Sequence, residues 1–153
     1  MPAYSFLDVM CAISGPGGTF TLSPGDGNAE EGVTVTMAED KDTMTIGADG
    51  VVMHSLHAAK PGTVAVRLLK ISPTNAQLAA LYGVQALSAA TWGVNTITIN
   101  DLARGDNITA RQAAFVQMPA INYAKIGGTV EWVFNAGFID IMLGAGIQAN
   151  SVF

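Results

Sequence analysis

The sequence predicts a mainly β domain, an antiparallel β-sandwich or barrel with one flanking α-helix. Apolar side chains recur at every second position in most apolar segments, which is typical of half-buried strands. Clusters of turn-forming residues divide the chain into about seven strands and one helix. With 153 residues the chain can bury a core without disulfides or structural metals, so we treat 1–153 as one domain.

The N-terminal part predicts a hairpin and then a third strand. The segment "FLDVMCAIS" (6–14) alternates, "GPGG" supplies a tight turn, and "TFTLS" (19–23) is the return strand. Valine or methionine alternates with threonine in "GVTVTM" (32–37), the pattern of a half-buried strand. The single cysteine, Cys11, lies in the first strand, where we expect a small buried side chain without redox function.

Residues 39–62 form a long connection in which the alternation weakens, and only the stretch from Met44 to Ile46 suggests a short strand. The segment contains acids, glycines, two histidines and two lysines. Connections of this length inside a compact domain are usually functional or ordered by a partner. We therefore predict an interaction loop over 39–62.

A strand over 63–71, "TVAVRLLKI", leads into the one helix signal of the chain. Ser72 can cap a helix and Pro73 suits the first helical position, where its missing N–H costs nothing. Apolar side chains follow at helical spacing: Leu78, Leu81 and Tyr82. These signals predict a helix over 72–83, which "VQALSAA" could extend.

Two more strands are predicted at 95–101, "NTITIND", and 107–118, "NITARQAAFVQM". Pro119 ends the second of them. We expect five of its side chains to share one face: Ile108, Ala110, Ala114, Val116 and Met118.

The last predicted strand covers 129–141 and is long and apolar. One face carries Val130, Trp132, Phe134, Ala136 and Phe138, and the other carries Thr129, Glu131, Val133 and Asn135. The apolar phase then moves to Ile139 and Ile141. This change indicates a bulge or bend near Gly137.

The motifs for enzyme chemistry or metal binding are incomplete. His54 and His57 lack further ligands at a recognisable spacing, and the acids of 39–42 do not match a calcium loop. "GPGGTF" lacks the lysine and helix of a phosphate loop, and Arg104–Asp106, "RGD", fits a turn. No Ser/His/Asp constellation is evident. We expect no enzyme activity, no cofactor and no metal.

Charge and hydropathy exclude other classes of function. Apolar runs are far shorter than the roughly 20 residues of a membrane-spanning helix, so we expect no membrane insertion. The N-terminal segment carries Asp8 and no basic residue, which argues against a secretory signal. The net charge of −5 repels free nucleic acid, because binding to phosphates depends on clustered lysine and arginine.

The composition points to self-association. Half of the residues (50%) are hydrophobic and only 12% are charged, about half of the usual charged fraction. Native sheets usually protect their edges with lysine, proline or bulges, and this chain has few such residues. We therefore expect identical neighbours to pair its edges in a closed ring.

Five blocks, in this order, span most of the chain: "YSFLDVMCAISGPGG", "EEGVTVTMAEDKDTMTIGADG", "HSLHAAKPGTVAVRLLKISPTNAQLAALY", "TITINDLARGD" and "GGTVEWVFNAGFIDIMLG". The series resembles the tail tube proteins of contractile-tailed bacteriophages, whose fold is similar to the type VI secretion tube protein. The resemblance implies hexameric rings with a continuous inner β-barrel, stacked into a hollow tube inside a contractile sheath. It implies as partners other copies of the chain, the sheath protein, a baseplate or initiator protein and a tail terminator protein. DNA would pass through the lumen without specific binding, and the tube would be a virion component assembled in the host cytoplasm.

The resemblance also implies candidate contact residues. By analogy the long connection would contact a neighbouring subunit and the adjacent ring through Glu39, Asp40, Lys41, Asp42, Met44, Ile46, Met53, His54, Leu56 and His57. The last strand would contribute to the ring wall through Val130, Glu131, Trp132, Val133, Phe134, Phe138, Ile139 and Asp140. Asp8, Glu131 and Asp140 are expected to face the lumen or to meet Arg67, Arg104 or Arg111 across an interface.

Three alternatives remain at this point. A tube of a contractile secretion system or bacteriocin would have the same fold and assembly but would not carry DNA. A ligand-binding β-sandwich could stack sugars on its aromatic residues: Tyr82, Trp92, Tyr123 and Trp132. A small hydrolase would need the catalytic constellation that the sequence lacks.

Overall fold

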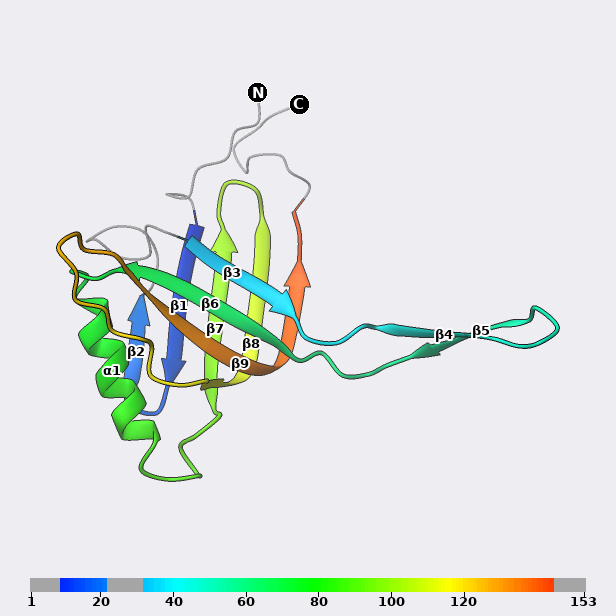
Figure 1. Cartoon of the computed structure of the whole chain (residues 1–153), viewed down its shortest axis with the longest axis horizontal. Helices are drawn as coiled ribbons and strands as arrows, with labels where there is room; N and C mark the ends of the chain where they lie inside the picture. The colour runs from blue at the N-terminus through cyan, green and yellow to red at the C-terminus, as the bar shows by residue number, and fades with distance from the viewer. Residues whose placement is uncertain (1–8, 22–31, 145–153) are drawn as a thin grey trace.

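A computed structural model describes residues 9–21 and 32–144, within which the chain forms nine β-strands and one α-helix (Figure 1). The predicted positions 6–8, 22 and 23, including Asp8, lie outside the described residues. The elements are β1 (Val9–Gly15), β2 (Gly18–Thr21), β3 (Gly32–Met37), β4 (Asp42–Ile46), β5 (Val52–Leu56), β6 (Gly62–Leu69), α1 (Thr74–Gln85), β7 (Asn95–Asp101), β8 (Asp106–Phe115) and β9 (Thr129–Met142).

Seven strands form one antiparallel sheet in the order β2-β1-β7-β8-β9-β6-β3, and β4 and β5 form a separate two-stranded hairpin. The predicted mainly β, antiparallel character with one helix is confirmed. The described residues do not form a closed barrel, because the edge strands β2 and β3 are not paired with each other. Among the residues that the structure describes, the sheet therefore keeps two open edges.

β9 joins the two halves of the sheet. Its first part pairs with β6 from Thr129 to Ala136, and its later part pairs with β8 from Phe134 to Met142. Figure 1 shows β3, β6 and the first part of β9 crossing in front of β1, β7 and β8. The sheet thus folds over on itself at β9, and the apolar core lies between its two halves.

The core contains side chains from both halves, including Ile13, Val66, Ile97 and Trp132. An aromatic cluster surrounds Phe115, whose ring centroid lies 4.7 Å from that of Phe134 and 5.8 Å from that of Trp132. Tyr82 and Trp92 complete the cluster. Three of the four aromatic residues considered for sugar stacking therefore pack in or against the core.

The helix α1 begins and ends later than the predicted range 72–83. Pro73 precedes its first residue, and the Ser72 hydroxyl accepts a bond from the Thr74 N–H at 3.3 Å. The helix continues through Gly83 to Gln85, because a buried amide pair anchors its end. Gln85 and Asn95 exchange two hydrogen bonds, of 2.6 and 2.7 Å.

The helix is bonded to both halves of the folded sheet. Gln85 Nε2 donates to the Pro16 carbonyl in the turn between β1 and β2, at 3.1 Å. At the other end Trp132 Nε1 in β9 donates to Asn75 Oδ1 at 3.0 Å. The predicted apolar face is confirmed for Leu78 and Leu81, which are fully buried.

A bulge in β8 makes part of the predicted face wrong. Ile97 pairs with Ala110 and Asn95 pairs with Ala113, so β8 has one residue more than β7 in this interval. Gln112 takes up the irregularity with φ of 53°. The buried face therefore continues with Ala113 and Phe115. The predicted Ala114, Val116 and Met118 are not buried.

The predicted change of phase in β9 is confirmed at Ile139 but is wrong for Ile141, which is 45% exposed. Val130, Trp132, Phe134 and Ala136 are buried, and the next buried side chain is Ile139. The change occurs before Phe138, which is 39% exposed instead of sharing the face of Trp132 as predicted. Gly137 lies beside the Gln112 side chain, so the bend of β9 and the bulge of β8 are neighbours.

Candidate assembly surface

The predicted interaction loop is a β-hairpin that extends away from the folded sheet (Figure 1). It continues the pairing of β3 with β6, because the Ala38 N–H donates to the Pro61 carbonyl at 3.0 Å. The His57 N–H then donates to the Lys41 carbonyl at 2.9 Å, and β4 and β5 pair from Asp42 to Ile46. The short strand predicted at 44–46 is confirmed, whereas β5 was not predicted.

Local turn chemistry closes the tip of the hairpin. The Gly47 N–H donates to the Val51 carbonyl at 2.8 Å, and the Asp49 carboxylate accepts the Val51 N–H at 3.1 Å. Gly50 has φ of 86°, a value that side chains disfavour. The conformation of the tip is thus fixed by hydrogen bonds among its own residues and by the glycine at position 50.

The hairpin has an apolar face and a polar face, since opposite residues of an antiparallel pair point to the same side. The register places Ile46 opposite Val52, Met44 opposite His54 and Asp42 opposite Leu56. One side therefore carries Met44, Ile46, Val52 and Leu56 together with the bonded pair Asp42 and His54, and we call the four hydrophobic residues the apolar face. The polar face holds Thr43, Thr45, Met53 and Ser55.

The apolar face is open to solvent in the single chain. Its side chains are 55% (Met44), 57% (Ile46), 48% (Val52) and 81% (Leu56) exposed. An isolated two-stranded hairpin is marginally stable in water, and a contiguous apolar surface usually marks an interaction site. The hairpin is therefore the strongest candidate for a contact with another molecule.

The two histidines of the hairpin have separate partners. His54 Nδ1 lies 2.9 Å from Asp42 Oδ2, and His57 Nε2 lies 2.6 Å from the Thr43 hydroxyl. Within 9–21 and 32–144, no three His, Cys, Asp or Glu side chains are grouped so that they could hold a metal ion. The two histidines are thus surface residues that bond to other residues of the hairpin.

An ion cluster fixes the base of the hairpin to β9. Asp140 Oδ1 accepts a bond from Lys60 Nζ at 3.0 Å, and Asp140 Oδ2 accepts one from Arg111 Nη2 at 3.2 Å. The hydrogen bond and charge of Lys60, followed by Arg111, lower the pKa of the Asp140 carboxyl. The backbone adds a bond of 2.9 Å from the Ile139 N–H to the Lys60 carbonyl.

Both of the predicted acids that the structure describes meet predicted basic partners, but they do so within one chain. Glu131 lies directly opposite Arg67 across β9 and β6, with 2.9 Å between Oε2 and Nε. Asp140 meets Arg111, as described above. Arg104 instead occupies the turn before β8, where its backbone N–H donates to Asp101 Oδ1 at 3.2 Å.

The ring-wall candidates divide between two environments. Val130, Trp132, Phe134 and Ile139 are buried in the core. The others lie toward the outside of the sheet: Glu131, Val133, Phe138 and Asp140. Only this second group is available for contact with a neighbour or with the contents of a tube.

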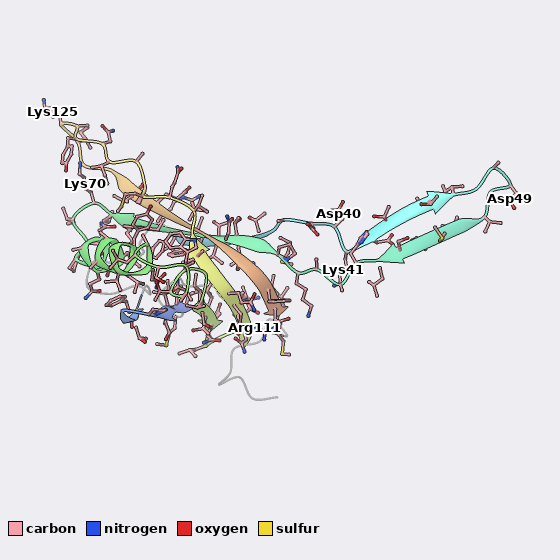
Figure 2. The ribbon with its side chains drawn as sticks, turned by 90° about the horizontal axis from the view of Figure 1, so that it is seen from below. Asp40, Lys41, Asp49, Lys70, Arg111 and Lys125 are labelled. Carbon is pink, nitrogen blue, oxygen red and sulfur yellow. The ribbon has the colours of Figure 1, made fainter. Side chains whose placement is uncertain are left out.

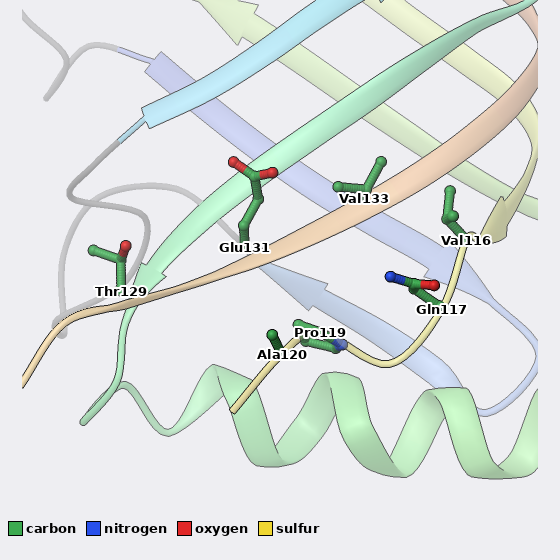
Figure 3. A pocket seen from close by; sticks show the side chains of 7 residues that line it. All are labelled: Val116, Gln117, Pro119, Ala120, Thr129, Glu131 and Val133. Carbon is green, nitrogen blue, oxygen red and sulfur yellow. The ribbon is translucent and has the colours of Figure 1, made fainter. Parts of the chain in front are cut away.

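A surface pocket lies between the first part of β9 and the segment 116–120 (Figure 3). Among its lining residues only Glu131 is ionisable, and Arg67 already binds that carboxylate at 2.9 Å. The other polar side chains of the lining are Gln117 and Thr129, and the remaining lining residues are apolar.

Sequence reasoning missed two features of this surface. Val52 was not among the contact candidates, although it pairs with Ile46 on the apolar face. The repeated pattern of apolar residues on facing strands becomes visible only once β5 is recognised. The ion cluster at the base of the hairpin also includes Lys60, whose long-range contact with Asp140 is not indicated by any local pattern.

The described residues contain no helix with the length and hydrophobicity needed to cross a bilayer.

Comparison with known proteins identifies a family and related folds. The model of the bacteriophage PhiTE tail tube protein family matches residues 1–144. No curated protein matches the sequence. A chain in the PVC sheath–tube complex of an extracellular contractile injection system, in its extended state, has a TM-score of 0.57 at 10% identity, with 87% of this chain and 88% of that chain covered. A chain in the tube-terminating cap of the anti-feeding prophage has a TM-score of 0.57 at 8% identity, with 94% and 93% covered.

Proposed function

The chain belongs to the bacteriophage PhiTE tail tube protein family and is a structural subunit of a tail tube, and we propose that its copies form hexameric rings that stack into a hollow tube. The tube conducts DNA during ejection and is enclosed by a contractile sheath. Stacking contacts run through the hairpin formed by β4 and β5, and β9 contributes to the ring wall.

The apolar face of the hairpin is the observation that carries this proposal. Its four side chains are about half to four-fifths exposed in the single chain. Complete cover by a neighbour is worth roughly 4–7 kcal/mol of hydrophobic free energy per subunit, at about 1.5–3 kcal/mol for each fully buried apolar side chain. Assembly gains this free energy by burying the four side chains, whereas in a monomer they stay exposed to water.

The two open sheet edges support ring formation. β2 and β3 end the sheet without a partner strand in the described part of the chain. A closed ring of identical copies removes such edges, because each copy can pair its edge with the next one.

The charges support passage of DNA without specific binding. The net charge is −5, and Arg67, Lys60 and Arg111 are held by carboxylates of the same chain. Basic side chains that are neutralised in this way offer little attraction to a phosphate backbone. A wall of such subunits lets the polyanion slide.

The partners follow from the family and from the place of a tube in a contractile machine. They are other copies of the chain, a sheath protein, a baseplate or initiator protein and a tail terminator protein. The subunit is assembled in the host cytoplasm and resides in the virion, and it has no catalytic function. The fold is also similar to chains of contractile injection systems, which supports one alternative, the tube of a contractile secretion system or bacteriocin without DNA as cargo.

Electron microscopy with sedimentation velocity on the same purified sample tests the proposal. We expect hollow tubes or stacked rings of uniform diameter, with six subunits per ring in averaged end views. A protein that stays monomeric at every concentration would contradict it.

A matched variant tests the role of the hairpin. Replacement of residues 42–56 by two glycines connects Lys41 to His57, whose backbones are already bonded at 2.9 Å. Because the core lies outside this segment, the variant should fold and give monomers or single rings. If this variant formed tubes of normal length, the hairpin would not be required for the stacking contact.

A further inference from the structure

The end of the molecule opposite the hairpin carries a second exposed apolar group. Figure 2 shows Lys70 and Lys125 at one end and Asp49, at the hairpin tip, at the other. Beside the two lysines lie some of the most exposed large hydrophobic side chains of the described residues: Ile71 (86%), Tyr123 (85%) and Ile126 (83%). We call these five residues, Lys70, Ile71, Tyr123, Lys125 and Ile126, the basic end.

The basic end is held together by direct contacts between its two segments. The Lys70 N–H donates to the Gly128 carbonyl at 3.1 Å. Lys70 Nζ donates to the Asn122 carbonyl and lies 3.8 Å from the centroid of the Tyr123 ring. The segment after β6 and the segment before β9 therefore present one joint surface.

The hairpin and the basic end have opposite charges. The hairpin and its base carry Glu39, Asp40, Asp42 and Asp49 against two lysines, Lys41 and Lys60, of which Lys60 is already paired with Asp140 of β9. Of the acids of the hairpin and its base, only Asp42 is paired with a described basic side chain. At the basic end neither Lys70 nor Lys125 forms an ion pair with a described acid. Both surfaces thus keep charges available for a partner.

We propose that the apolar face of the hairpin docks on the basic end of a second copy of this chain. Met44, Ile46, Val52 and Leu56 cover Ile71, Tyr123 and Ile126 of that copy. The unpaired acids of the hairpin meet Lys70 and Lys125. This inference rests on the proposed function and assigns the acceptor surface for its stacking contact.

The position of the two surfaces at opposite ends fixes the kind of assembly. The contact is heterologous, since the hairpin of one copy meets a different surface of the next. Each docked pair leaves one free hairpin and one free basic end. Copies therefore add head to tail, which gives the tube two unlike ends.

Paired cysteines test the contact directly. In the variant Met44→Cys/Ile126→Cys, each proposed contact contains one new thiol from each copy. A short bismaleimide should then convert assembled protein into a ladder of dimers, trimers and longer chains on denaturing gels. Cys11 is buried and free, so the natural thiol should not react in folded protein.

Matched variants make the result specific. Met44→Cys and Ile126→Cys alone place one thiol in each contact and should give no ladder. Thr45→Cys/Ile126→Cys moves the hairpin thiol to the polar face and should cross-link much less. A second pair reverses charges: Asp49→Lys and Lys125→Glu should each raise the critical concentration of assembly about threefold, and the combined variant should restore it.

The outcomes separate this inference from the proposed function. The inference is overturned if the paired-cysteine variant forms tubes that give no cross-linked ladder and the combined charge variant does not restore assembly. The proposed tube function would still stand in that case. Failure of the unmodified chain to form any tube overturns the proposed function, and this inference with it.

Discussion

Leu56→Ser is the sharpest single test of the hairpin as a contact surface. Leu56 is 81% exposed, so most of its hydrophobic free energy is gained only on assembly. Complete burial of a leucine side chain is worth about 1.5–3 kcal/mol. We therefore expect the variant to lose about 1.5–2.5 kcal/mol per contact, which raises the critical concentration about 10- to 60-fold.

Met53→Ser provides the matched control. Met53 is 58% exposed, but it lies on the polar face of the same hairpin. We expect the critical concentration of Met53→Ser to change less than about threefold. Both variants should melt within about 2 °C of the unmodified monomer. Pelleting of tubes over a concentration series measures the first quantity, and thermal melting of dilute protein the second. Normal assembly of Leu56→Ser, or an equal defect in Met53→Ser, would refute the assignment of faces.

Three further predictions concern the folded subunit. Gly15→Ala places a Cβ 1.8 Å from Asn95 Oδ1 and should break the Gln85–Asn95 pair, with a loss of about 2–4 kcal/mol in chemical denaturation; Gly83→Ala, where a Cβ meets nothing within 4 Å, is its control. The lowered pKa of Asp140 means that its stabilising contribution is present above the unfolded value of 3.8 and is lost as the pH falls through the folded value; the Tm of Asp140→Asn should lack this acid-dependent step, and equal pH profiles of the two proteins would count against the ion cluster. Burial raises the pKa of the Cys11 thiol to about 12, so iodoacetamide at pH 8 should leave native protein unmodified and label it after unfolding, and rapid native labelling would contradict the buried position.

The alternation of apolar residues predicted most strands of the sheet, because each of these strands has one face on the core, whereas the strand at 63–71 was predicted from an apolar run. The same rule failed within β8, where the bulge at Gln112 moved the buried face from Ala114 to Ala113. No glycine marks that position, so local sequence contains no signal for it. The corresponding bend in β9 was predictable since Gly137 accompanies a visible change of phase.

The hairpin shows what sequence alone leaves open about the candidate site. Its length predicted an interaction segment, but its two faces depend on the register of Met44 with His54 and of Ile46 with Val52. The register of β9 with β6 also places Glu131 against Arg67 of the same chain, whereas the sequence led us to expect Glu131 either at the lumen or at an interface. The basic end was missed because Lys70 and Tyr123 are far apart in sequence and become neighbours only in the folded chain.

The continuity of β3 and β6 with the hairpin has a mechanical consequence. A pull on the docked hairpin enters the subunit along these two strands and reaches β9 through the pairs from Gly62–Ala136 to Leu69–Thr129. Force along paired strands stretches their hydrogen bonds together, whereas force across them would open the bonds one after another. We expect a tube of such subunits to resist extension strongly along the direction of the hairpins, and the rupture force of single tubes held at both ends would measure this resistance.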